Sequence, residues 1–450
     1  MLESTIVGIA TAIGEGGISI IRISGSDAIS LFEQVFVTKG YATPYESHKL
    51  MYGHIYDEET LIDEAMGVVM YAPKSYTMED VCEIHVHGGT LVTQLTMQCL
   101  LQRGASIAMP GEFTKRAFMN GRIDLSEAEA VMGIIHAQST AALQVAQLQL
   151  SGGQSHYIHD LQNKLIALLA GMEAHIDYPD EIDEEEALDG LQRGLSSIIL
   201  SLQSSISKRN ARLVSEGLRL ALCGTPNAGK STLFNALLGE EKAIVTNIPG
   251  TTRDVLSGTF MLDGIAIQVF DTAGLRNSSD VVEQIGVHKA QETLSTADVA
   301  LILIDGSTPL ETNEKDLLRH PPTCPFAVLL TKGDAIQAVT ENDLRTQGYT
   351  GEILSISAHT GMGLDNIHAY IRPYITLPQQ TMLTQARHME VASEVLTHLQ
   401  HANCLIEQNS PLELATVDLH EALYLLGRIT GESVDEKLLD DIFSRFCVGK

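Results

Sequence analysis

Short apolar runs typical of β-strands recur in the N-terminal part of the chain. They are "ISIIRIS" (18–24), "MGVVMYA" (66–72) and "VCEIHVHG" (81–88), separated by Gly, Pro and Asp residues and by segments of helical periodicity. Strands interleaved with helices in this way indicate an α+β domain. We predict that this domain covers residues 1–118.

Helical periodicity dominates the next segment and returns near the C-terminus. Apolar residues recur at spacings of three and four at Leu161, Leu165, Leu168, Met172 and Ile176, and again at Met389, Ala392, Leu396, Leu399, Ala402 and Ile406. Such spacing places the residues on one face of a helix. We expect one all-helical domain in two parts, residues 119–213 and 379–450.

Strand-like and helical runs alternate between these two helical parts. The strand-like runs are "LRLALC", "IAIQVFD", "DVALILID", "PFAVLLT" and "EILSIS". This alternation is typical of an α/β domain with a mostly parallel sheet. We therefore expect an α/β domain over residues 214–378, inserted into a discontinuous helical domain.

Composition and charge narrow the classes of function. The chain has 450 residues and 44% hydrophobic content, which fits about three domains of roughly 150 residues each. Its formal net charge of −28 argues against broad nonspecific binding of nucleic acid, so an RNA substrate would need a local basic patch or a basic partner. No basic signal region precedes the first apolar residues and no uncharged apolar run approaches ~18 residues, so we expect a cytoplasmic protein without a membrane segment.

The segment "GTPNAGKS" (224–231) fits the phosphate-loop pattern GxxxxGK[ST] and lies between a predicted strand and the helical run "TLFNALLG". Its glycines allow backbone N–H groups to turn toward phosphate, Lys230 reaches the outer phosphates and Ser231 can ligate Mg²⁺. In the following "DTAG" (271–274), Asp271 can approach the metal and Gly274 the γ-phosphate. Thr252 in "GTTRD" is a candidate second Mg²⁺ ligand from a switch loop.

The segment "TKGD" (331–334) favours guanine as the base. Asp334 can pair with the N1 and N2 hydrogens of guanine, as the Asp of the usual NKxD motif does. Thr331 supplies only a hydroxyl where an Asn amide normally braces the loop, so guanine affinity is expected to be modest. Ser357 and Ala358 complete the loop on the base side.

The residue after "DTAG" is Leu275, which has no group that could align the attacking water. Another residue must do so. Glu283 in "DVVEQIG" is an acidic candidate, and the alternative is that it is an ordinary exposed helix charge.

The motifs "GTPNAGKST", "NIPGTTRD", "DTAGLR", "VEQIG" and the closing "FCVGK" together resemble those of the tRNA uridine-modification GTPases of the MnmE (TrmE) family. "GISIIRISG", "EDVCEIHVHGG" and "PGEFTKRAFMNGRIDLSEAEA" extend the resemblance over the N-terminal third. The resemblance implies an N-terminal folate-binding and dimerisation domain, a discontinuous helical domain and an inserted Ras-like G domain.

The resemblance also implies the reaction and its partners. With an FAD-containing flavoprotein of the MnmG type, in a heterotetramer or larger complex, such proteins add a carboxymethylaminomethyl or aminomethyl group to C5 of the tRNA wobble uridine. The carbon comes from 5,10-methylenetetrahydrofolate, of which 5-formyltetrahydrofolate is an analogue. The alternative class is a switch GTPase of ribosome assembly, but the chain lacks the basic RNA-binding domain that such proteins usually carry.

Functional residues of the family map onto this sequence. The folate contacts correspond to Arg22, Glu83, Arg122 and Lys450, with Arg122 standing where a lysine is common. A K⁺ ion, which supplies positive charge beside the phosphates, would be held by Asn227, Thr246, Ile248 and Thr251, and Mg²⁺ by Ser231 and Thr252. Glu283 corresponds to the acid that positions water. The expected GTP-binding residues are Asn227, Ala228, Gly229, Lys230, Ser231, Thr232, Thr246, Asn247, Ile248, Pro249, Gly250, Thr251, Thr252, Asp271, Thr272, Ala273, Gly274, Thr331, Lys332, Asp334, Ser357 and Ala358.

Cys447 lies three residues before the C-terminal Lys450. Gly449 occupies a place where a prenylation motif needs an aliphatic residue, and six cysteines without a CxxC pair are typical of reduced thiols. We predict a catalytic role for Cys447 in the modification chemistry. The alternative is a buried cysteine that packs beside Phe443 and Phe446.

Overall fold

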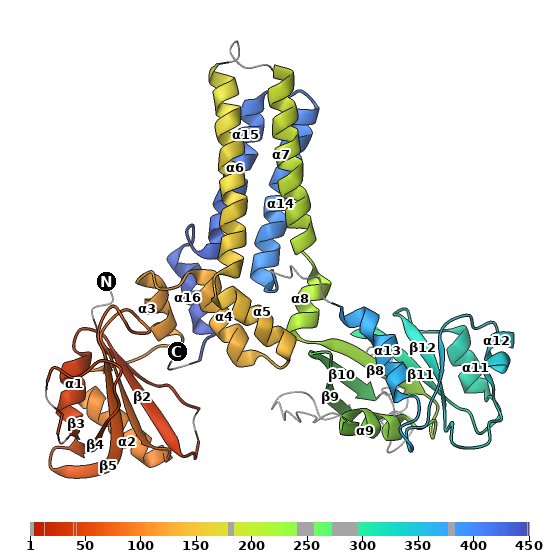
Figure 1. Cartoon of the computed structure of the whole chain (residues 1–450), viewed down its shortest axis with the longest axis horizontal. Coiled ribbons are helices and arrows are strands. Elements are labelled where there is room, and N and C mark those ends of the chain that lie inside the picture. The colour runs from red at the N-terminus through yellow and green to blue at the C-terminus, as the bar shows by residue number, and fades with distance from the viewer. Residues whose placement is uncertain are drawn as a thin grey trace, which may run out of the picture. The chain divides into compact units, whose positions relative to one another are not determined.

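The computed structural model describes residues 4–12, 14–38, 40–41, 43–178, 184–240, 256–271, 296–376, 383–447 and 449 (Figure 1). The chain divides into two compact units. The first comprises Met1–Ile135, Leu148–Gln203 and Glu390–Lys450, and the second His136–Gln147 and Ser204–Met389. Among the described residues, no helix combines the length and the apolar character that crossing a membrane requires.

A twisted sheet forms the N-terminal part of the first unit, and in the described residues its strand order is β3-β4-β5-β6-β2-β1-β7. The strands are β1 (Ile6–Ile9), β2 (Ile18–Ser24), β3 (Phe36–Thr38), β4 (Met51–Asp57), β5 (Thr60–Met70), β6 (Val81–His87) and β7 (Ser106–Ile107). Side chains alternate between the two faces, so Ile21 and Ile84 enter the core that α1 (Ala28–Val35) and α2 (Thr90–Gln102) cover. Arg22 and Glu83 therefore lie on the opposite face of the sheet, where their side chains are 18% and 15% exposed.

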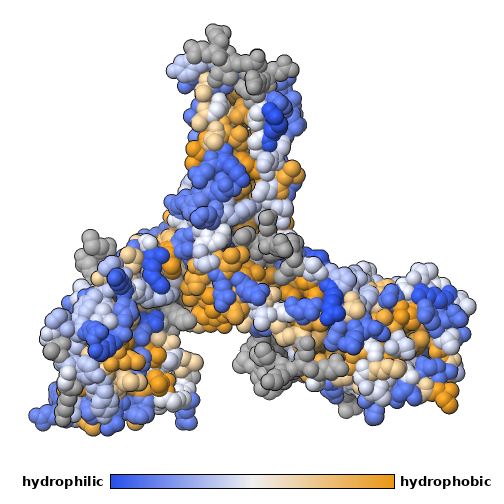
Figure 2. Space-filling view, in the orientation of Figure 1, coloured by the Kyte–Doolittle hydropathy of each residue, from blue (hydrophilic) through white to orange (hydrophobic). Residues whose placement is uncertain are grey.

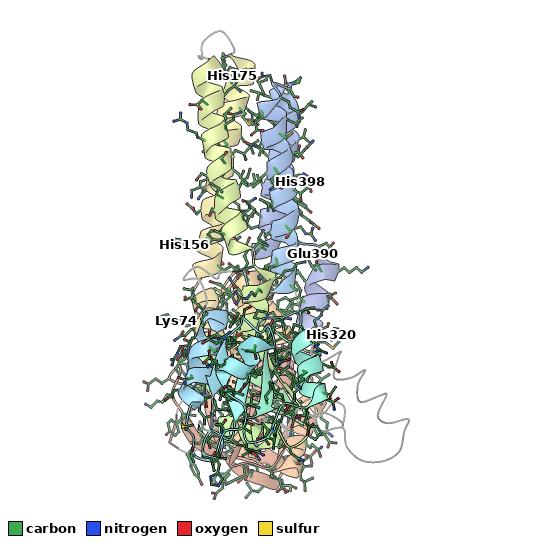
Figure 3. The ribbon with its side chains drawn as sticks, turned by 90° about the vertical axis from the view of Figure 1, so that its right-hand side faces the viewer. Lys74, His156, His175, His320, Glu390 and His398 are labelled. Carbon is green, nitrogen blue, oxygen red and sulfur yellow. The ribbon has the colours of Figure 1, made fainter. Side chains whose placement is uncertain are left out.

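Helices from both ends of the chain build the rest of the first unit. They are α3 (Glu112–Met119), α4 (Leu125–His136), α6 (Gly153–Asp177), α7 (Glu184–Ser205), α14 (Ala386–Glu407), α15 (Leu412–Thr430) and α16 (Glu436–Ser444). The long helices α6, α7, α14 and α15 run side by side (Figures 1 and 3). Asp418 of α15 binds His398 and His401 of α14 at 2.8 and 2.6 Å, and Figure 3 shows His398 within this bundle. The predicted discontinuous helical domain is therefore confirmed.

The second unit contains a mostly parallel sheet, whose described strands have the order β13-β12-β11-β8-β10-β9. They are β8 (Leu218–Gly224), β9 (Leu256–Leu262), β10 (Ile265–Asp271), β11 (Val299–Asp305), β12 (Phe326–Thr331) and β13 (Ile353–Ser355). The helices are α5 (Thr140–Leu150), α8 (Lys208–Ser215), α9 (Lys230–Glu240), α11 (Thr312–Arg319), α12 (Glu341–Thr346) and α13 (Leu364–Ile375). Strand β8 pairs in parallel with both β10 and β11, which creates a switch point at its C-terminal end. Ligands of open α/β sheets bind at such a point.

The predicted strands are found where the apolar runs lie. The runs at 18–24 and 265–271 coincide with β2 and β10, whereas β5 begins six residues before the predicted run at 66–72 and ends at Met70. Sequence reasoning missed β9, which pairs antiparallel with β10 at the sheet edge. Its "LSGTFML" contains Gly258, which weakens a strand pattern, and the side chains of Leu238 and Phe234 pack closely against that position. The predicted boundaries at 118, 213 and 378 stay predictions.

Candidate functional site

The phosphate-binding loop connects the C-terminal end of β8 to the N-terminus of α9. Asn227 and Gly229 have φ angles of +69° and +91°, a left-handed conformation that glycine adopts freely and Asn tolerates better than most residues. The loop leads into the first turn of α9, and the N-terminus of a helix favours an anion through its N–H groups and its dipole. The strand–loop–helix context that the motif needs is thus present.

Lys230 and Ser231 begin α9 and lie at the C-terminal end of the neighbouring strand β10. Nζ of Lys230 donates hydrogen bonds of 2.7 Å to the carbonyl oxygens of Gly224 and Thr225. Oγ of Ser231 lies 3.4 Å from Oδ2 of Asp271, the last residue of β10. A hydroxyl and a carboxylate oxygen this close fit the oxygen shell that Mg²⁺ prefers, directly or through water.

Thr331 ends β12 and contacts the phosphate loop from the base side. Its Oγ1 lies 2.8 Å from the carbonyl oxygen of Ala228 and 3.1 Å from that of Ile304. The hydroxyl has one proton to donate, and the shorter contact favours Ala228. The single hydroxyl that replaces the usual Asn amide therefore still braces the phosphate loop.

In the predicted base-recognition loop, a hydrogen bond from Ser357 orients the Asp334 carboxylate. Oγ of Ser357 donates to Oδ1 of Asp334 at 2.6 Å, and this bond holds the pKa of Asp334 below its ordinary value. The carboxylate is therefore ionised near neutral pH. Lys332 pairs with Asp305 at the end of β11, and Ala358 follows Ser357 and packs against the core of this unit.

Part of the predicted nucleotide site falls outside the described residues. This is the case for Thr246, Asn247, Ile248, Pro249, Gly250, Thr251, Thr252, Thr272, Ala273, Gly274 and Glu283, and also for Leu275 and Lys450. Their predicted roles stay predictions. Thr232 is described and lies exposed in the first turn of α9.

The predicted folate residues Arg22 and Glu83 pair on the face of the N-terminal sheet that lies opposite α1 and α2. They stand opposite each other in the β2–β6 register, and Nε of Arg22 donates to Oε1 of Glu83 at 2.8 Å. His85 lies 3.4 Å from the other carboxylate oxygen. Burial acts to raise the pKa of Glu83, but the hydrogen bonds with His85 and Arg22 outweigh it and leave this pKa lowered. Glu83 is therefore an ionised acceptor.

Tyr76 joins Arg22 to the third predicted folate residue, Arg122. The Cζ atoms of Arg22 and Arg122 lie 5.4 and 4.7 Å from the centroid of the Tyr76 ring, within the range of cation–π attraction. Its hydroxyl lies 2.9 Å from Oγ1 of Thr114, and NH1 of Arg122 donates to its carbonyl oxygen at 3.0 Å. Sequence reasoning missed Tyr76, because one aromatic residue in a polar loop carries no periodic signal.

The C-terminal tail also contacts Arg22. The carbonyl oxygen of Gly449 lies 3.5 Å from NH1 of Arg22. Gly449 has a φ of +91°, and a Cβ there would collide with the carbonyl oxygen of Ile9 on β1. Gly449, the last described residue of the tail, thus packs closely against the N-terminal sheet.

Cys447 lies two residues earlier in this tail. Its carbonyl oxygen accepts a hydrogen bond from the N–H of Gly111 at 3.3 Å, and its side chain is exposed. Phe443 and Phe446 are buried without it. The alternative in which Cys447 is a buried packing residue is therefore wrong.

Family models and known relatives match this chain over nearly its whole length. The model for the MnmE helical domain matches residues 125–447, and the model for the GTP-binding protein TrmE N-terminus matches residues 5–122. The chain belongs to the MnmE family. It is 41% identical to the tRNA modification GTPase MnmE of Lachnoclostridium phytofermentans and 39% identical to that of Desulforamulus reducens, with 100% of each chain covered in both comparisons.

Solved structures match parts of this chain. The G domain of the T. maritima FeoB iron transporter is 27% identical, with 35% of this chain and 99% of that chain covered and a TM-score of 0.28. Era bound to a nucleotide and a segment of 16S ribosomal RNA is 27% identical, with 40% and 66% covered and a TM-score of 0.30. These TM-scores add nothing to the family assignment.

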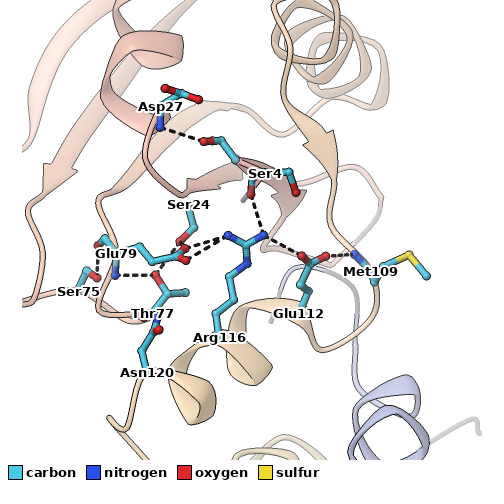
Figure 4. Close-up of polar contacts among 11 residues, drawn as sticks. Ser4, Ser24, Asp27, Ser75, Thr77, Glu79, Met109, Glu112, Arg116 and Asn120 are labelled. Carbon is cyan, nitrogen blue, oxygen red and sulfur yellow. Dashed lines mark hydrogen bonds and ion pairs between the residues drawn. The ribbon is translucent and has the colours of Figure 1, made fainter. Parts of the chain in front are cut away.

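A buried arginine supports the N-terminal site of this chain (Figure 4). Arg116 of α3 is 1% exposed, and its NH1 donates to both carboxylate oxygens of Glu79 at 3.2 and 3.1 Å. NH2 donates to the carbonyl oxygen of Ser4 and to Oε1 of Glu112, at 2.8 and 2.9 Å. Removing one partner of such a buried, charged network is strongly destabilising.

The same network fixes the loop that carries Tyr76. Glu79 accepts a hydrogen bond of 2.7 Å from Ser24 of β2, and Asn120 donates to the carbonyl oxygen of Thr77 at 2.7 Å. Tyr76 thereby lies in a loop held by β2 and by α3. Sequence reasoning did not single out this support.

Proposed function

We propose that this MnmE-family chain is a K⁺-activated GTPase that takes part in modifying the wobble uridine of tRNA. Together with an FAD-containing flavoprotein of the MnmG type, it adds a carboxymethylaminomethyl or aminomethyl group to C5, with a tetrahydrofolate one-carbon unit as the carbon source. The reaction takes place in the cytoplasm. GTP hydrolysis and tRNA modification are the activities for which its curated relatives are named.

One observation carries the proposal: a phosphate site and a folate-type site occur in the same chain. Lys230, Ser231 and Asp271 meet at the C-terminal ends of β8 and β10, which supports binding of a Mg²⁺-nucleotide. Asp334 supports the choice of guanine. A pure switch GTPase would have no use for the second site.

The N-terminal group suits a reduced folate. A pterin presents several N–H donors, for which the ionised Glu83 is a good acceptor, and the glutamate tail of folate carries carboxylates that suit Arg22 and Arg122. Tyr76 adds an aromatic face. We assign 5,10-methylenetetrahydrofolate to this site, with Lys450 as a further cation at the tail.

Exposed apolar side chains on the face of the N-terminal sheet opposite α1 and α2 support a homodimer. Ile18, Tyr52 and Met66 are 53%, 54% and 38% exposed on this face, and Figure 2 shows apolar surface on the N-terminal domain. A second copy of the same domain would cover these side chains in an isologous interface. The homodimer would then bind the flavoprotein in a heterotetramer or larger complex that acts on tRNA.

Glu83→Gln is expected to weaken binding of 5-formyltetrahydrofolate about 10-fold, because a charged acceptor is replaced by a neutral amide. Isothermal titration calorimetry on the full chain measures this. The matched control is Glu64→Gln on β5, an exposed glutamate whose neighbour is His54 at 4.0 Å. Unchanged affinity in Glu83→Gln would remove Glu83 from the site, and a wild-type chain that binds no folate would favour the ribosome-assembly alternative.

GTP turnover is expected to be about 10-fold faster in KCl than in NaCl at equal ionic strength, because K⁺ would supply positive charge at the phosphates. Asn227→Gly should abolish most of this difference. Glycine keeps the φ of +69° and removes the amide, whereas Asn227→Ala would add backbone strain. Equal rates in the two salts would contradict K⁺ activation, and an undiminished K⁺ response in Asn227→Gly would exclude Asn227 as a ligand.

A further inference from the structure

A buried carboxylate outside the nucleotide motifs contacts the phosphate loop. Glu314 of α11 is 3% exposed, and its Oε1 accepts a hydrogen bond of 3.1 Å from Oγ1 of Thr225. Thr225 is the second residue of the phosphate loop and is itself 8% exposed. A buried carboxylate is costly unless it is hydrogen-bonded, so this contact contributes to holding both residues in place.

The second oxygen of Glu314 is bound from another direction. Oε2 accepts a hydrogen bond of 3.0 Å from the backbone N–H of Glu311, the residue that caps α11. This reciprocal capping box orients the glutamate against the first turn of its own helix. The carboxylate therefore connects the N-terminus of α11 to the phosphate loop.

Thr225 also contacts Lys230. Its hydroxyl donates to Glu314, and its carbonyl oxygen accepts a hydrogen bond of 2.7 Å from Nζ of Lys230. The direction of that carbonyl helps to decide where the lysine ammonium points. Further along the loop, Thr331 holds the carbonyl oxygen of Ala228. The phosphate loop is thus braced at Thr225 and at Ala228 by side chains from outside it.

We propose that Glu314 is a positioning residue for phosphate binding, which acts through Thr225 on the Lys230 ammonium. The inference rests on the proposed GTPase function and adds a determinant of nucleotide affinity to it. A loop that is already ordered loses less conformational entropy when the nucleotide binds, so the brace raises affinity for GDP and GTP alike. Uniform binding of this kind changes KM and leaves kcat largely unchanged.

Thr225→Val tests the brace, because valine keeps the shape of threonine and removes the hydroxyl. We expect the Kd for GDP and the KM for GTP to rise about 10-fold, with kcat at saturating GTP within about two-fold of wild type. Titration of GDP by calorimetry and steady-state turnover on the full chain give these values. If KM and Kd stay at their wild-type values, or if kcat falls while KM does not change, the proposal is overturned.

Thr340→Val is the matched control for loss of a threonine hydroxyl that contacts the carboxylate of a helix capping box. Thr340 caps α12 in the same unit, where its Oγ1 lies 2.7 Å from Oδ2 of Asp343. Like Thr225→Val, this variant is expected to lose some thermal stability, but it should keep the wild-type Kd for GDP. An equal loss of GDP affinity in both variants would show that general destabilisation, and not positioning, is responsible.

Two further variants keep the test decisive if Thr225→Val folds poorly. Thr225→Ser retains the hydroxyl and should restore the Kd to within about three-fold of wild type. Thr225→Ala leaves space for water beside Glu314 and should weaken GDP binding as much as Thr225→Val, and wild-type affinity in Thr225→Ala would overturn the proposal. Failure of the wild-type chain to bind GDP would instead overturn the proposed GTPase function.

Discussion

Asp334→Asn is expected to weaken GTP binding by about 100-fold and to make xanthosine triphosphate the preferred nucleotide. The Asp334 carboxylate would accept two hydrogen bonds from guanine, and bonds to a charged group contribute about 1.5–3 kcal/mol each. The Ser357 hydroxyl keeps this carboxylate oriented and its pKa low, so it is ionised under assay conditions. An asparagine amide presents a donor, which suits the carbonyl oxygen that xanthine has in place of the guanine amino group.

Competition between the two nucleotides, followed by calorimetry and by turnover, measures this exchange of preference. Asp365→Asn is the control, because Asp365 lies exposed in the first turn of α13 in the same unit. It should retain the preference for GTP. An Asp334→Asn variant that still prefers GTP would mean that another residue reads the base.

Cys447→Ser is expected to reduce the modified uridine in tRNA by about 100-fold or more while GTP hydrolysis stays near the wild-type rate. Two residues of extended chain span at most ~7 Å, so Cys447 lies close to Gly449, whose carbonyl oxygen contacts Arg22. The exposed thiol therefore lies beside the proposed folate site. Serine keeps the shape and some of the hydrogen bonding but is a far weaker nucleophile than a thiolate.

Mass spectrometry of tRNA nucleosides from cells that carry only the variant gives the level of modification, and the purified protein gives the GTPase rate and thermal stability. Cys404→Ser is the matched control, since Cys404 is an exposed thiol on α14. It should leave the modified uridine at the wild-type level. Normal modification in Cys447→Ser cells would end the proposed chemical role.

Where a feature depends on a continuous segment, the sequence was sufficient to predict its local structure. The phosphate loop is one short stretch between an apolar run and a helix, and its glycines, Lys230 and Ser231 carry their roles in local backbone geometry. The strand β10 coincides with the predicted run at 265–271 for the same reason, because period and apolar length are local properties. The resemblance to a known family then added Arg22, Glu83 and Arg122, which local pattern could not select.

Tertiary structure decided which distant groups meet. Tyr76 faces Arg22 and Arg122, Gly449 reaches Arg22 over a separation of 427 residues, and Glu314 reaches Thr225 over 89. None of these contacts has a signal in periodicity, because each depends on strand register and on which face a helix buries. Thr331 shows what sequence alone could not predict. The sequence showed a hydroxyl in place of an amide. The packing of β12 beside β11 and against the phosphate loop decided that this hydroxyl reaches Ala228. The sequence by itself thus determined the helices, the strands and the contiguous motifs. Long-range packing determined the contacts that support these motifs, because such contacts form only when remote segments are brought together.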